Sequence, residues 1–404
     1  MRRLVRFAWI LAANALLTAL LLEIALRVQQ PFLHLMSRGY HDSPNYHFAF
    51  IDHPIWDHQL RPGLAGYEIE VRPPVAAEGL RYVLRTNSWG CRYGEIAVPR
   101  PESTFRVIVL GDSFTEGLRE EETSSQYLER SLDALGLPLD FEVMNCGASS
   151  YSLLPILLRL REQLLAAEPD AVIVNIDLTD LHDDYFRRRP DLRIDAAGEP
   201  VAVGDPRAHA SALRDFLEFH SYAARGLAAW ARLFDRAVRH RSRDASAAEP
   251  RKPDGKGELF TLSEKYRLHT RDPEAAADFE RAWQFFSVQL DRIVALCDAK
   301  GIPCAFSTYP HQAQLPVGDA APALHREFAK RIAAQLAARG VFFYDAYDDI
   351  ARAYAGDHFL YFTGDMHFRP AGQRAWGKAY AQAFTPWVQE LSARRPARTA
   401  GRRR

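Results

Sequence analysis

Cysteine is scarce in this chain, and its spacing excludes the commonest zinc sites. The four residues are Cys91, Cys146, Cys297 and Cys304. Structural zinc sites use close pairs such as C-x-x-C, and no two of these cysteines are that near in sequence. An even count permits disulfides, whose pairing the sequence cannot assign. Because a buried thiol behaves as a small apolar side chain, we favour free, buried cysteines.

An excess of charge of one sign is also absent. The sequence holds 51 basic residues (Lys and Arg) and 51 acidic ones (Asp and Glu). A balanced chain gives no electrostatic reason to expect a nucleic-acid partner. We find no internal repeat either. The 404 residues suffice for two average domains or for one large domain with insertions.

A long apolar run begins near the N-terminus. Residues 8–28 read AWILAANALLTALLLEIALRV, and about 20 apolar residues span a bilayer. No small-residue cleavage site follows the run, which favours an uncleaved anchor over a signal peptide. Arg2, Arg3 and Arg6 precede it and keep that end in the cytoplasm. We therefore predict a single-pass protein of the inner (cell) membrane whose remainder faces the periplasmic or extracytoplasmic side; a buried core helix is the alternative.

The rest of the chain divides by composition. We predict a cytoplasmic stub and transmembrane anchor at 1–28, then a neck at 29–103 that packs on the main domain and contains the strand-like pieces GYEIEV and RYVLRT. The main domain spans 104–392 with an insertion at about 185–276, and a basic, disordered tail occupies 393–404. The insertion is either a lid or substrate wall or a surface elaboration.

Strands and helices alternate from residue 104 onward. The strand-like segments are FRVIVLG, DFEVMNCG, DAVIVNIDL, PCAFSTYP and VFFYDAY, with helical spacing between them. Such alternation predicts a parallel sheet covered by helices on both faces. We expect a flavodoxin-like, three-layer α/β/α sandwich with five parallel strands in the order 2-1-3-4-5.

The segment RVIVLGDSFTEG places a serine where ligands bind. In open α/β sheets that place is the carboxyl end of a central strand, and Ser113 follows such a strand. A serine nucleophile needs a histidine oriented by a carboxylate. The segment HFLYFTGDMHFRPAG supplies Asp365 and His367, two residues apart, so that in extended backbone they project to the same side.

Acyl transfer also needs donors for an oxyanion. We expect the backbone N–H of Ser113, together with Gly147 in NCGASSYSL at the end of the next strand. A third donor is expected from NIDLTDLHDDY after the third strand, where Thr179 and Asn175 are the candidates.

These segments together resemble the SGNH (GDSL-type) hydrolase superfamily. GDSFTEG resembles its first block with Ser113 as nucleophile, Gly147 its second-block glycine, and GDMHFRPAG its last block with Asp365 and His367. The segment TNSWGCR before the first block resembles the membrane-anchored branch. DLTD stands where the third block usually reads Gly-x-Asn-Asp, so Thr179 replaces the oxyanion asparagine while Asp180 is present. The resemblance covers roughly 86–180 and 277–390 and implies a serine esterase that needs no cofactor and no metal.

Four functions remain open. The leading one is an esterase or deacylase that acts on an acyl ester, with a carbohydrate-linked ester as one candidate. The second is an O-acyltransferase of envelope or exported polysaccharide. The third is a metal-dependent phosphoesterase built on the acidic run Asp177, Asp180, His182, Asp183 and Asp184. The fourth is a carbohydrate-binding or scaffold protein, which the altered third block motivates.

Overall fold

A computed structural model describes most of the chain. The described residues are 2–29, 49–71, 80–206, 262–315, 324–356, 359–362 and 365–394, with a few positions at 216–224. The middle of the predicted insertion and most of the predicted basic tail lie outside them. The chain divides into two units, Met1–Phe48 with His209–Pro253, and Ala49–Ala208 with Asp254–Arg404. The second unit contains the sheet.

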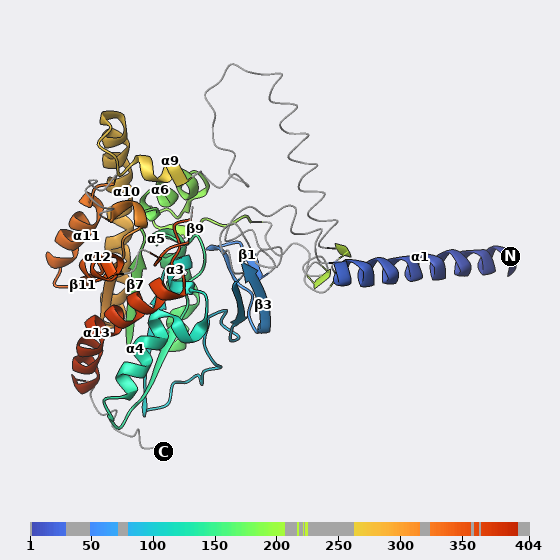
Figure 1. Ribbon diagram of the computed structural model, residues 1–404, viewed down its shortest axis with the longest axis horizontal. Helices are drawn as coiled ribbons and strands as arrows, with labels where there is room; N and C mark the ends of the chain where they lie inside the picture. Colours follow the sequence, from blue (N-terminus) through green and yellow to red (C-terminus); the bar gives the residue numbers. More distant parts are fainter. Residues whose placement is uncertain are drawn as a thin grey trace. The chain divides into compact units, whose positions relative to one another are not determined.

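Five parallel strands form the centre of the second unit (Figure 1). They are β5 (Thr104–Leu110), β6 (Asp140–Asn145), β7 (Ala171–Ile176), β10 (Cys304–Thr308) and β11 (Phe342–Asp345). Their order is β11-β10-β7-β5-β6, which confirms the predicted order 2-1-3-4-5. Every residue of β5 is buried, as expected of a central parallel strand.

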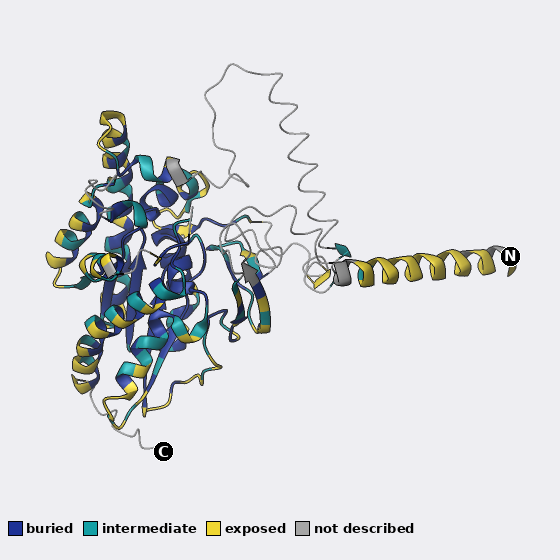
Figure 2. Cartoon of the chain, viewed as in Figure 1, coloured by how far each residue is buried: buried dark blue, intermediate teal, exposed yellow. Residues whose placement is uncertain are grey.

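Alternate residues of the strands pack into two separate cores, because successive side chains of a strand point to opposite faces. Ile108 and Leu110 of β5 belong to the core under α5 (Leu153–Glu162), α10 (Pro273–Lys300) and α11 (Glu327–Ala337). Val107 and Val109 belong to the core under α4 (Ser124–Asp133), α12 (Tyr347–Gly356) and α13 (Pro370–Arg394). The sheet is buried between these layers (Figure 2), which confirms the three-layer sandwich. We did not predict α12.

Smaller elements accompany the sandwich. Three two-stranded antiparallel sheets pair β1 (Phe50–His53) with β2 (Asp57–Leu60), β3 (Ala65–Val71) with β4 (Leu80–Arg85), and β8 (Arg193–Ile194) with β9 (Pro200–Ala202). The predicted strand-like pieces of the neck form β3 and β4. The short helices are α3 (Ser113–Glu116), η3 (Glu120–Glu122), η4 (Leu164–Ala167), α6 (Asp180–His182), η5 (Asp183–Arg188), η6 (Arg189–Asp191), α9 (Leu262–Arg267) and η7 (Gln312–Gln314).

The first unit contains the helix α1 (Arg2–Gln29). Its segment Val5–Ala25 is long and apolar enough to cross a membrane, and none of it is buried (Figure 2). A signal sequence has the same length and composition, so the anchor stays a prediction. The Glu23 carboxylate accepts hydrogen bonds from the Ser221 hydroxyl and the Ala223 N–H within this unit.

Candidate active site

A tight turn at the end of the central strand positions Ser113. β5 ends at Leu110, and Ser113 opens the one-turn helix α3. Asp112 caps this turn, since its Oδ1 accepts the backbone N–H of Phe114 at 3.0 Å. Residue 111 must be glycine, because a Cβ there would lie 2.1 Å from Thr115 Oγ1. The turn thus fixes the serine at the carboxyl edge of the sheet.

Ser113, His367 and Asp365 lie in a continuous series of contacts. Ser113 Oγ is 2.8 Å from His367 Nε2, and His367 Nδ1 is 2.5 Å from Asp365 Oδ1. Ser113 is 5% exposed and His367 4% exposed, so the contact between them is largely shielded from water. In this geometry a histidine can take the proton of a serine while the carboxylate orients the ring.

The loop before α13 brings Asp365 and His367 together by a bend rather than by extended backbone. Asp365 Oδ1 accepts the backbone N–H of His367 at 2.9 Å in addition to its contact with the ring. Tyr361 pairs with Phe368 across the bend, and the Phe362 N–H donates to the His367 carbonyl at 3.0 Å. The predicted contact is present, but the extended conformation assumed for it is wrong.

A second histidine–carboxylate pair, absent from our sequence analysis, lies beside this series. His311 Nε2 is 2.7 Å from Asp177 Oδ2, and both residues are fully buried. His311 Nδ1 is 2.7 Å from the hydroxyl oxygen of Tyr266. The ring of Phe114 stacks with both His311 and His367, with centroids 5.2 Å apart in each case. His311 directly follows the fourth predicted strand, and this position could have identified it as a candidate from the sequence.

Three buried carboxyl groups at this edge of the sheet have pKa values shifted in different directions. Burial alone would raise the pKa of Asp177, but the charge of His311 and hydrogen bonds from His311 and Thr179 bring that pKa below its usual range. Burial and the neighbouring Asp177 raise the pKa of both Asp112 and Asp180 well above the ordinary value. The surroundings of Asp177 therefore favour its charged form, whereas those of Asp112 and Asp180 disfavour theirs.

The expected third oxyanion donor has a protein partner in the structure. The Thr179 N–H donates to Asp177 Oδ1 at 2.5 Å, and the Thr179 side chain also contributes to the lowered pKa of Asp177. The alternative candidate, Asn175, donates from Nδ2 to Thr115 Oγ1 at 2.9 Å. A single hydroxyl proton cannot serve Asp177 and an oxyanion at once, so the role of Thr179 stays a prediction.

The other two expected donors flank the nucleophile turn. A Cβ at Gly147 would lie 2.7 Å from the backbone nitrogen of Glu116, so this glycine lets the second strand end pack directly on α3. The Gly147 N–H donates to Asn145 Oδ1 at 3.1 Å. Across the described residues, the backbone N–H of Ser113 has no acceptor.

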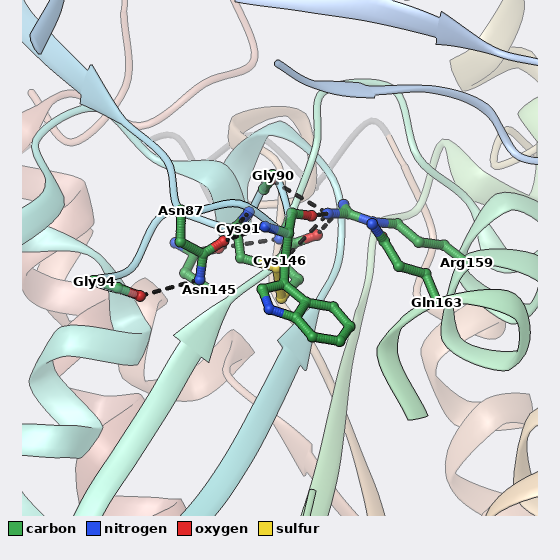
Figure 3. Close-up of a disulfide and its surroundings, with 10 residues drawn as sticks. Asn87, Gly90, Cys91, Gly94, Asn145, Cys146, Arg159 and Gln163 are labelled. Carbon is green, nitrogen blue, oxygen red and sulfur yellow. Dashed lines mark hydrogen bonds between the residues drawn. A yellow bond between two sulfur atoms is a disulfide. The ribbon is translucent and has the colours of Figure 1, made fainter. Parts of the chain in front are cut away.

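A disulfide joins the predicted neck to the second strand end. Cys91 is bonded to Cys146, and their Cα atoms are 4.3 Å apart (Figure 3). The Arg92 N–H donates to the Asn145 carbonyl at 2.7 Å, and this backbone pairing brings the neighbouring cysteines together. The expectation of free thiols is therefore wrong for this pair, because the pairing depends on a contact between distant segments. The other two cysteines are free and buried.

Two buried arginines hold the same region. The Arg92 guanidinium donates to the carbonyls of Gly117 and Leu118, at 2.8 and 2.9 Å, where α3 ends. Arg159, on α5, donates to the carbonyls of Cys146 at 3.0 Å and Gly90 at 3.2 Å (Figure 3). Residues on both sides of the disulfide thus support the turn that carries Ser113.

The acidic run after β7 is engaged in protein contacts. Asp183 pairs with Lys265 at 2.6 Å, and Asp184 Oδ1 accepts the hydroxyl of Ser152 and the N–H of Leu154. Within the described part of the chain, no three His, Cys, Asp or Glu side chains are grouped to hold a metal ion. The run gives the metal-dependent alternative no geometric support.

The fold is a three-layer α/β sandwich, and the contact between Ser113 and His367 lies at the carboxyl edge of its sheet. Residues 109–375 match the model of the GDSL-like lipase/acylhydrolase family, a span that contains Ser113, Asp365 and His367. The chain belongs to this family, and the protein is an ester-bond hydrolase.

Solved structures with a similar fold include three esterases. A catalytic mutant of Axe2, an acetylxylan esterase from Geobacillus stearothermophilus, is 12% identical, with a TM-score of 0.37 over 70% of this chain and 94% of its own. The esterase EstA from Pseudoalteromonas sp. is 13% identical, with a TM-score of 0.34 over 70% and 98%. The family 3 carbohydrate esterase of Clostridium thermocellum is 13% identical, with a TM-score of 0.34 over 71% and 98%. The comparison with curated proteins gave no match.

Proposed function

We propose that the protein is a serine esterase or deacylase that hydrolyses an acyl ester outside the cytoplasm. In this proposal Ser113 is the nucleophile, His367 the general base and Asp365 the residue that orients it. The observation that carries the proposal is the buried series of contacts from Ser113 Oγ through His367 to Asp365. The family of the chain supports ester hydrolysis independently of that geometry.

The proposed reaction has two halves. His367 Nε2 takes the hydroxyl proton of Ser113 while Oγ attacks the acyl carbon; the bond to the alcohol then breaks, and His367 returns the proton to the leaving alcohol oxygen. Water next attacks the acyl-enzyme and gives its proton to His367, and the acyl group leaves as the acid. The carbonyl oxygen carries the developing charge, for which the backbone N–H of Ser113 is one candidate donor, with Gly147 and Thr179 as the further candidates.

Two features support the location outside the cytoplasm. Within α1 the apolar residues 8–28 follow Arg2, Arg3 and Arg6, which hold the first end of the helix inside by the positive-inside rule. The Cys91–Cys146 disulfide is of a kind that persists in oxidising compartments such as the periplasm.

A fluorophosphonate probe tests the proposal without knowledge of the substrate. We expect the detergent-purified full chain to be labelled, and labelling to vanish in Ser113→Ala with an unchanged melting temperature. Ser149→Ala is the matched control, since Ser149 is a buried serine on the loop beside α3. Labelling of Ser113→Ala at another serine would remove the mechanism.

A further inference from the structure

Two adjacent arginines at the end of η5 have buried N–H groups without partners. Arg188 is 3% exposed; its Nη2 donates to the Ser150 carbonyl and lies 3.4 Å from Asp57 Oδ2. Among the described residues, Arg188 Nε and Nη1 have no hydrogen-bond partner, and neither has the buried Nη1 of Arg187. A guanidinium stays protonated in a protein, and leaving its buried N–H donors without acceptors costs free energy of folding. The arrangement is suited to an acceptor that the chain does not supply.

The charges around the pair show which kind of acceptor is missing. Lys265 is paired with Asp183 at 2.6 Å, and Arg188 lies near Asp57. Arg187 makes no direct ion pair in the described part of the chain; burial and the charge of Arg188 lower its pKa, and the charges of Asp183 and Asp57 partly oppose that shift. A cation without a direct ion-pair partner favours a ligand that carries a negative charge.

The remaining carboxyl group nearby, Asp184, makes no hydrogen bond to these arginine N–H groups, although its Oδ2 is also buried without a partner. Asp184 Oδ1 is committed to the hydroxyl of Ser152 and the N–H of Leu154, at the start of α5. Burial raises the pKa of Asp184 to about 6. Arg187 therefore keeps a buried N–H group without an acceptor, and a carboxylate matches the parallel N–H groups of a guanidinium.

The arginine pair adjoins the turn that bears Ser113. Arg188 holds the carbonyl of Ser150, and the N–H of the preceding Ser149 donates to Glu116 Oε2, on α3, at 2.9 Å. Ser150 is three residues from Gly147, a span of at most about 11 Å in extended chain. One ligand that carries its carboxylate at a distance from its ester can therefore reach both Ser113 and the arginines.

We propose that Arg187 and Arg188 form a subsite for a carboxylate that the substrate carries at a distance from its ester. The class of molecule that fits is an acylated acidic saccharide, since one sugar chain carries both an esterified hydroxyl and a carboxylate. That this subsite serves catalysis rests on the proposed function of Ser113. Binding of the carboxylate by the two arginines does not depend on that function.

The test measures binding with no turnover. The full chain carrying Ser113→Ala is titrated by calorimetry with trigalacturonate and with neutral galactotriose at equal ionic strength. We expect trigalacturonate to bind at least 10-fold more tightly than galactotriose, and Arg187→Gln to remove that difference. Arg189→Gln is the matched control, since Arg189 is the adjacent, exposed arginine, and it should change binding less than twofold.

Several outcomes would overturn the proposal. They are equal binding of the two trisaccharides, binding unchanged by Arg187→Gln, or displacement of trigalacturonate by an equal concentration of inorganic phosphate, which would mark a phosphate site.

If Arg187→Gln does not fold, Arg187→Lys keeps the charge and loses the planar pair of donors, so it should weaken binding several-fold. Wild-type affinity in that variant would contradict the carboxylate geometry. Failure of the probe to label Ser113 in the wild type would refute the proposed function and leave this binding result standing.

Discussion

At the scale of single residues, the proposed reactivity of Ser113 depends on one buried imidazole. His367→Ala removes the group 2.8 Å from Ser113 Oγ and leaves the fold in place. We expect kcat for an activated ester such as p-nitrophenyl acetate to fall about 10⁴-fold or more, as on loss of a triad member in other serine hydrolases. His325→Ala is the control for loss of a histidine. A rate within twofold of wild type in His367→Ala would refute the assignment.

Thr179 provides the second prediction at this scale. Thr179→Val keeps the shape of the side chain and deletes its hydroxyl. If that hydroxyl turns to the oxyanion during the reaction, kcat should fall about 10-fold or more with little change in melting temperature, because the interaction forms chiefly in the transition state. If instead the melting temperature falls and kcat is preserved, the Thr179 hydroxyl interacts only with Asp177 and takes no part in the reaction.

The site residues found from the sequence are those that a local pattern marks. Ser113 follows the apolar run Val107–Leu110 of a buried strand, and Asp365 and His367 stand two apart before a helix. His311 and Tyr266 were missed because their partners lie far away in sequence: His311 meets Asp177 across 134 positions. Asp177 was noted only as a member of an acidic run, and nothing local shows that it is paired with a buried histidine.

At the scale of elements, Asp184 links η5 to the first turn of α5 through Ser152 and Leu154. Burial raises its pKa to about 6, against about 3.9 for an unfolded aspartate. The folded state therefore holds this proton more tightly than the unfolded state. The stabilisation is complete below about pH 4 and is lost as pH rises through 6.

Asp184→Asn keeps the acceptor oxygen and removes the titration. Between pH 4 and pH 7.5, the free energy of unfolding of wild type should fall by about 2–3 kcal/mol relative to this variant. Urea denaturation at the two pH values measures the difference. Asp191→Asn, at an exposed aspartate on η6, should follow wild type. An identical pH dependence in Asp184→Asn and wild type would contradict the assignment.

The Cys91–Cys146 disulfide is a second link between elements, because it closes a loop of 55 residues around the nucleophile strand. Replacing both cysteines by serine should lower the free energy of unfolding by about 2–4 kcal/mol, chiefly because the unfolded chain regains freedom. A reductant should lower the melting temperature of wild type toward that of the double variant and should not change the double variant. A double variant as stable as oxidised wild type would show that the bond contributes nothing.

The elements themselves were predictable to different degrees. The five parallel strands were visible as buried apolar runs, and their order followed from the alternation with helices. The hairpin of β1 and β2 was not visible, since its residues are mostly half-buried and polar, as in Asp57–Leu60. The disulfide was not visible because the antiparallel contact of Arg92 with Asn145 is isolated from any named strand.

At the scale of the whole molecule, the topology in the membrane decides which substrates the site can meet. The segment Val5–Ala25 can span a bilayer, and Arg2 and Arg3 precede it. Alkaline phosphatase fused after Arg404 should be active, and a fluorescent protein that folds only in the cytoplasm should be dark at the same position. An N-terminal tag should remain on the full-length chain in the membrane fraction.

The reasoning behind this prediction is electrostatic. Basic residues beside a span resist transfer across the membrane, so the arginines keep the N-terminus inside and the catalytic unit outside. Changing Arg2, Arg3 and Arg6 together to Glu should lower phosphatase activity per fusion molecule. The control is the same number of Lys→Glu changes within residues 252–300, which should leave that activity unchanged because charges far from the span have little influence on topology. Loss of the N-terminal tag by cleavage would identify a signal peptide instead of an anchor. Cytoplasmic fluorescence of the second fusion would place the esterase on the other side of the membrane and remove the envelope ester as its substrate.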